Sequence, residues 1–94
     1  MIDGAKAKEI GLALDVLPPE KLMAHCKDVA GRIAKRGPIA VAQAKRVIDQ
    51  GADVSLADAC GLERQAFAKL FATADQREGM KAFLEKRAPI FTGT

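Results

Sequence analysis

The sequence predicts an all-α protein: a small bundle of about four helices, preceded by a short helix and one unpaired extended segment. Apolar residues recur at three- and four-residue steps over most of the 94 residues, which is typical of amphipathic helices. Glycine and proline stand where these patterns stop and start. Only one short segment alternates in the manner of a strand. A chain of this length fits one small domain.

The N-terminal residues hold the short helix and the extended segment. Asp3 is a suitable N-cap for a helix that continues to Ile10, and Gly11 ends it. Residues 12–17 carry a large apolar side chain at every second position, which favours a short strand. No other segment offers this strand a partner, so its backbone N–H and C=O groups would lack a neighbour.

Four longer helices are expected after this segment. Pro19 and Pro38 suit the first turns of two of them, and Gly37 and Gly51 suit their ends. Ser55 begins a capping box for the third. The expected ranges are 19–36, 38–50, 55–71 and from 73 or 75 to about 87–89, with a tail at 90–94.

Composition and charge exclude several classes of protein. The net charge is only +3, the charges are mixed, and aromatic residues make up 4%, so nucleic acid is not an expected partner. No apolar run approaches the roughly 20 residues that span a bilayer, so no membrane association is expected. Cys26 and Cys60 lie inside helical patterns, and we expect them to be small core residues in a reducing compartment. With no apolar leader at the start, this favours a cytoplasmic protein.

No catalytic or metal-binding constellation is evident in the sequence. The glycines are scattered, and the single Ser has no nucleophile motif around it. One His and two distant Cys do not make a four-ligand zinc site. His25 and Cys26 are adjacent on a helix and therefore do not face each other. Glu63 is expected to pair with Arg64 or Arg77. We expect no catalytic residue, no metal and no cofactor.

The run from Phe71 to Arg87, FATADQREGMKAFLEKR, resembles the C-terminal part of enoyl-CoA hydratases, which are members of the crotonase superfamily. Weaker matches precede it in the same order: Gly11-Leu12, Val16-Leu17-Pro18, and Gly37-Pro38 followed by Ala44-Lys45. The resemblance covers essentially the whole chain. It implies that residues 1–18 are the end of the crotonase spiral core, a short helix plus a strand remnant. Residues 19–94 are then the helical C-terminal domain.

The resemblance also implies a function for the longer protein and a lesser one for this chain. Hydration of a 2-enoyl-CoA thioester needs an acid, a base and an oxyanion hole, which the family supplies from segments with no counterpart here. This chain alone is therefore not expected to be catalytic. Phe83 and Lys86 match the family's contacts to coenzyme A, with the ring facing adenine, the ammonium meeting the 3′-phosphate, and Arg87 adding charge. Self-association is expected, as trimers or hexamers.

Other interpretations of the same residues stay open at this point. Phe83 could be a core residue and Lys86 a solvated helix end. The chain could be a free-standing helical protein-interaction module without an enzymatic role, a choice that the reading frame upstream of Met1 would settle. A small basic nucleic-acid binder is a weaker third option. The family also holds isomerases, dehalogenases and hydrolases, so the reaction of the longer protein is open too.

Overall fold

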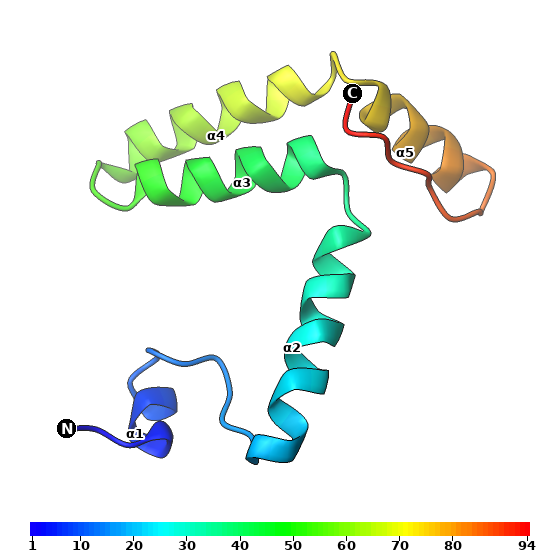
Figure 1. The fold of residues 1–94 in the computed structure, drawn as a ribbon. Coiled ribbons are helices and arrows are strands. Elements are labelled where there is room, and N and C mark those ends of the chain that lie inside the picture. The colour runs from blue at the N-terminus through cyan, green and yellow to red at the C-terminus, as the bar shows by residue number, and fades with distance from the viewer. The chain divides into compact units, whose positions relative to one another are not determined.

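The computed structural model describes residues 1–94 and consists of five helices without a strand, as Figure 1 shows. The helices are α1 (Gly4–Glu9), α2 (Pro19–Ala34), α3 (Pro38–Gly51), α4 (Leu56–Leu70) and α5 (Ala74–Leu84). The chain divides into two compact units, Met1–Gly31 and Arg32–Thr94. The all-α prediction is confirmed.

Helix α1 begins and ends as its sequence predicts. The amide of Lys6 donates to Asp3 Oδ1 at 2.8 Å, which caps the first turn. Gly11 has a φ of 77°, in the left-handed region where glycine is favoured. The amide of Leu12 then donates back to the carbonyl of Ala7 at 2.8 Å, which closes the C-terminal turn.

Residues 12–17 do not form the expected strand. Lacking a partner strand, the segment folds as a loop on α1. The Lys8 ammonium donates to Asp15 Oδ1 at 2.6 Å and the amide of Val16 donates to the same oxygen at 2.9 Å. A Cβ built on Gly4 would lie 3.2 Å from Val16 Cγ1, so the loop packs closely on the first turn of α1. Local side-chain bonds thus replace the ladder that the alternation predicted.

Helices α3 and α4 form an antiparallel hairpin and lie side by side (Figure 1). Pro38 stands at the start of α3, where its missing N–H costs nothing. The amide of Asp58 donates to Ser55 Oγ at 3.2 Å, and that hydroxyl donates to the Asp58 carboxylate at 2.6 Å. The predicted N-cap at Ser55 is therefore present, with the Asp58 carboxylate bonded to the Ser55 hydroxyl instead of to the Ser55 amide of a full capping box. A Cβ on Gly51 would lie 3.4 Å from Ala59 Cβ, an ordinary van der Waals contact, so the two helices approach closely at this end of the hairpin.

Helix α5 carries the C-terminal segment along its side, as the red chain beside it in Figure 1 shows. Thr73 Oγ1 accepts from the amide of Gln76 at 3.1 Å and caps the helix. The last residues were expected to be a tail, but they are tied to α5. The amides of Thr92 and Gly93 donate to the two oxygens of Asp75 at 2.7 and 2.9 Å, and Asp75 is only 7% exposed.

The helices bury almost none of their apolar stripes within this chain. Ala82 is the only buried apolar residue, and no large side chain is fully buried. Phe67 and Phe71 meet edge to face with ring centroids 5.3 Å apart, yet Phe67 stays 62% exposed. The expectation that Cys26 and Cys60 are core residues is wrong: both are free and exposed, because no second layer covers their helix faces. None of the helices combines the length and apolarity needed to cross a membrane.

Candidate functional site

The C-terminal end of α5 is a turn built around Lys86. The amide of Lys86 donates to the carbonyl of Phe83 at 3.2 Å, and the amide of Arg87 donates to that of Ala82 at 3.0 Å. These two bonds form a Schellman motif, which requires a left-handed residue after the helix. That residue is Lys86, with a φ of 53°, the only non-glycine residue of the chain with positive φ.

The left-handed backbone at Lys86 is unfavourable for a residue with a side chain. It costs an L-residue roughly 1–2 kcal/mol, and for this reason glycine usually takes the position. Helix α1 ends with the same pair of bonds and has Gly11 at the equivalent place. Strained backbone of this kind clusters at functional sites, so its presence favours a role for the Lys86 side chain.

Arg87 is held by carboxylates on both sides. Its two terminal nitrogens donate to Glu78 Oε1 and Oε2 at 2.6 and 2.9 Å, and its Nε donates to Glu85 Oε2 at 2.6 Å. Hydrogen bonds from Arg87 and from the amide of Ile90 lower the pKa of Glu78 from 4.5 to about 2. The same pairs raise the pKa of Arg87. The guanidinium is thus engaged by two carboxylates, and the expectation that Arg87 adds charge beside Lys86 stays a prediction.

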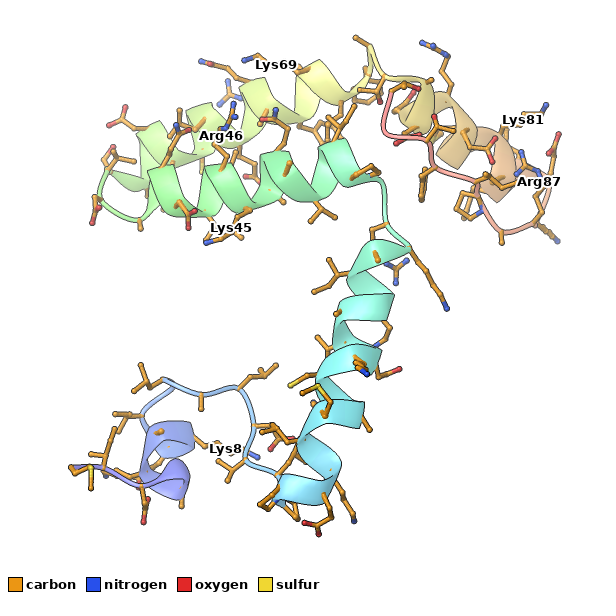
Figure 2. All side chains as sticks on the ribbon, in the orientation of Figure 1. Lys8, Lys45, Arg46, Lys69, Lys81 and Arg87 are labelled. Atoms are coloured by element: carbon orange, nitrogen blue, oxygen red, sulfur yellow. The ribbon has the colours of Figure 1, made fainter.

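Phe83 and Lys86 are both available at the surface. Phe83 is 79% exposed, which rules out core packing of its ring within this chain. Lys86 is exposed and makes no ion pair, whereas Lys81 lies 3.9 Å from Glu85. Figure 2 shows Lys81 and Arg87 at the C-terminal end of α5. An aromatic face next to a free ammonium suits a ligand with a flat ring and a negative charge.

Two apolar hollows lie in the unit Arg32–Thr94. One, of about 290 Å³, follows the α3–α4 hairpin. The other, of about 390 Å³, lies among α3, α4, α5 and Phe91. Ala40, Phe67 and Leu70 line both hollows, so together they form one groove, which we call the hairpin groove. Its lining is nearly all apolar, which suits a protein surface better than a polar substrate.

The remaining titratable candidates do not form a catalytic centre. Glu63 lines the edge of the hairpin groove and pairs with neither Arg64 nor Arg77, contrary to expectation. His25 is half-buried in a hollow of about 310 Å³ that Asp15 also lines. A hydrogen bond from Lys8 lowers the pKa of Asp15. No cluster of His, Cys, Asp or Glu side chains is placed to hold a metal ion.

Sequence reasoning missed the two acidic anchors of α5. Asp75 binds the segment 92–93, and Glu78 binds Arg87 and Ile90. A weak signal was present: Gly93 lies four residues after Pro89 and directly follows Thr92, and an isolated glycine often marks a close approach of the backbone. Its φ is 77°, and an added Cβ would lie 3.1 Å from Pro38.

These features define an all-helical domain that carries an apolar groove and, at the C-terminal end of one helix, an exposed aromatic ring and an exposed ammonium. Residues 1–94 match the model of the enoyl-CoA hydratase/isomerase family, and the chain belongs to this family.

Individual relatives agree with this assignment. The chain is 42% identical over 91 residues to a crotonyl-CoA hydratase from Syntrophomonas wolfei, covering 97% of this chain and 35% of that protein. It is 37% identical over 92 residues to a 2,3-dehydroadipyl-CoA hydratase from Escherichia coli, covering 98% and 36%. A crystal structure of an enoyl-CoA hydratase from Bacillus anthracis superposes with a TM-score of 0.94 at 40% identity, covering 99% and 36%. The chain thus spans about a third of the length of these relatives.

Proposed function

We propose that this chain is the C-terminal helical domain of an enoyl-CoA hydratase that hydrates 2-enoyl-CoA thioesters in fatty acid metabolism. In this proposal residues 1–18 belong to the end of the spiral core and residues 19–94 form the helical domain. The domain completes the coenzyme A site through Phe83 and Lys86. Two free thiols, Cys26 and Cys60, support a reducing, cytoplasmic location.

The observation that carries the proposal is the left-handed Lys86 beside an exposed Phe83. A lysine occupies a backbone position that favours glycine, with a φ of 53°, and its ammonium has no partner in the chain. Adenine offers a flat ring to Phe83, and the 3′-phosphate of coenzyme A offers charge to Lys86. Coenzyme A has both features, and relatives named for acting on coenzyme A thioesters support it as the ligand.

The proposal is tested by Lys86→Ala in the full-length protein. We expect KM for a 2-enoyl-CoA to rise about two- to fivefold with kcat nearly unchanged, because an exposed ion pair contributes about 0.2–1 kcal/mol to binding. Lys81→Ala, which removes a cation from the same helix, is the control and should leave KM unchanged. Equal KM values for Lys86→Ala and the unaltered enzyme would remove Lys86 from the site.

The chain alone is expected to bind without catalysing. The one hollow that brings a histidine and a carboxylate together is lined by His25 and Asp15, and Asp15 is already bonded to Lys8 and to the Val16 amide. Hydration requires both an acid and a base at the substrate, and no other hollow offers such a pair. Crotonyl-CoA mixed with this chain should therefore show no loss of the enoyl-thioester absorbance above background. Measurable turnover would contradict the proposed division of roles.

A second role, self-association, rests on the hairpin groove. Ile48 and Phe67, which line it, are 68% and 62% exposed. Contiguous apolar surface of this kind marks interaction sites in soluble proteins. We infer that the groove serves assembly, in trimers or hexamers of the longer protein or as an interaction module in its own right.

A further inference from the structure

We propose that Glu78 and Arg87 are positioning residues that hold the turn at Lys86 and keep its ammonium free for an anionic ligand. This inference rests on the proposed function of Lys86. It names the two residues that hold Lys86 in the conformation in which it binds the ligand. Neither Glu78 nor Arg87 needs to touch the ligand.

The Glu78 carboxylate links helix α5 to the segment that follows the turn at Lys86. Glu78 lies on α5 before the turn, and its carboxylate accepts from Arg87 and from the amide of Ile90, which follow the turn. The distances are 2.6 and 2.9 Å to the guanidinium and 2.8 Å to the amide. One side chain therefore ties both ends of the segment 87–90 to the helix. We call these bonds of Glu78 to Arg87 and Ile90 the Glu78 brace. Lys86 is fixed between the Glu78 brace and the last turn of α5.

The backbone at Lys86 is strained, with a φ of 53°. A left-handed residue with a side chain persists only where its surroundings hold it, because the extended and right-handed regions are lower in free energy. The Schellman bonds at 3.0 and 3.2 Å fix the turn from the helix side. The Glu78–Arg87 pair fixes it from the other side. Without the brace, Lys86 would be able to relax to a negative φ and its ammonium would move.

The charges around the turn also favour a free ammonium at Lys86. Glu85 is the neighbour of Lys86, and Glu78 faces the same turn, so two carboxylates compete for nearby cations. Arg87 engages both of them, with Nε on Glu85 at 2.6 Å and its terminal nitrogens on Glu78. A guanidinium bound through its planar fork is a better partner for a carboxylate than an ammonium. Arg87 therefore leaves the Lys86 ammonium as the unpaired charge of the turn.

The test is an NMR titration of the 94-residue chain with adenosine 3′,5′-bisphosphate, in the unaltered form and in three variants. The variants are Lys86→Ala, Glu78→Gln and the two together. Asp49→Asn is the matched control, because it removes one negative charge and one exposed ion pair, to Lys45, far along the chain. The Cα chemical shift of residue 86 reports in each sample whether its backbone stays left-handed.

We expect Glu78→Gln and Lys86→Ala each to weaken binding about threefold, which is the range for an exposed ion pair. The double variant should bind no more weakly than Lys86→Ala, since Glu78 acts only through Lys86. The direction is decisive. Loss of a negative charge by itself strengthens the binding of an anion, as Asp49→Asn should show slightly, whereas loss of positioning weakens it.

Each other result overturns a named part of the argument. If Lys86→Ala weakens binding and Glu78→Gln does not, the positioning role is wrong and the proposed function stands. If Glu78→Gln weakens binding equally in the presence and absence of the Lys86 side chain, Glu78 acts on the ligand by another route. If Lys86→Ala leaves binding unchanged, the proposed function falls and the positioning role falls with it.

Discussion

Lys86 and Gly11 close two helices with the same pair of backbone hydrogen bonds, yet only one of them is a glycine. Sequence rules predict the end of α1 at Gly11 because glycine adopts positive φ at little cost. They place no such marker at Lys86. For this reason the predicted end of α5, at 87–89, lies three to five residues beyond the observed end at Leu84. Because Lys86 is not a glycine, the sequence does not indicate that α5 ends there. Its unusual backbone conformation is also the strongest local indication of function.

Replacing Lys86 by glycine should stabilise the C-terminal turn of α5. Glycine removes the strain of a φ of 53°, and we expect a gain of about 0.5–1 kcal/mol in the free energy of local opening. Hydrogen exchange of the Arg87 amide measures this free energy. Lys81→Gly, inside the same helix, should instead destabilise it by about 1 kcal/mol. Faster exchange at Arg87 in Lys86→Gly would show that the turn is not strained.

The Glu78 carboxyl should titrate far below an ordinary glutamate. Hydrogen bonds from Arg87 and Ile90 lower its pKa to about 2. A carboxyl with a lowered pKa stabilises the folded form above its unfolded pKa, and this contribution is lost as pH falls through the folded value. The pair therefore contributes fully near neutral pH, weakens below the ordinary value of 4.5 and is lost near pH 2. Carbon-detected NMR of the Glu78 carboxyl gives the midpoint.

The control for this titration is Arg87→Gln, which removes the main cause of the shift. In that variant the Glu78 midpoint should move up toward 4.5. A midpoint near 4.5 in the unaltered chain would contradict the brace.

At the scale of elements, the hydrophobic periodicity and the positions of the capping, glycine and proline residues predicted most of the structure. The starts at Pro19 and Pro38 and the cap at Ser55 depend on short-range sterics and hydrogen bonds, which the local sequence contains. Residues 12–17 and 88–94 were predicted less well. Their conformations depend on side chains elsewhere, on Lys8 and Asp75, and such long-range bonds leave no periodic trace in the sequence.

Asp75 should control whether the C-terminal segment stays attached to α5. It is 7% exposed and accepts from the amides of Thr92 and Gly93. Hydrogen bonds to a charged group contribute roughly 1.5–3 kcal/mol, so Asp75→Ala should expose both amides to fast hydrogen exchange. Asp49→Ala, which removes an exposed carboxylate paired with Lys45, should change exchange there by less than about 0.5 kcal/mol. Unchanged protection of residues 92 and 93 in Asp75→Ala would contradict the anchor.

At the scale of the whole molecule, the helices are amphipathic but the chain supplies few surfaces to cover them. Burial was therefore the property that sequence reasoning predicted worst. Stripes on α2 and α4 indicated core positions for Cys26 and Cys60, and both are exposed. Hydrophobic periodicity predicts which face of a helix is apolar, but it does not predict whether residues of the same chain bury that face. Phe83 and Lys86 were proposed as site residues from a resemblance alone, because no spacing rule identifies a ligand contact that would consist of one ring and one ammonium.

The apolar surface of this chain should drive self-association through the hairpin groove. Phe67 lines both hollows of that groove and is 62% exposed. Burying such a ring contributes about 2 kcal/mol, so Phe67→Glu should weaken association roughly 30-fold. Sedimentation should then give a mass well above 10.0 kDa for the unaltered chain at high concentration and a mass near 10.0 kDa for Phe67→Glu. The control is Lys45→Gln, which lowers the net charge by as much as Phe67→Glu does but lies on the side of α3 away from α4 (Figure 2). This variant should associate like the unaltered chain. A strict monomer of the unaltered chain at high concentration would show that the hairpin groove does not drive self-association. An unchanged mass for Phe67→Glu would show that the chains associate through another face.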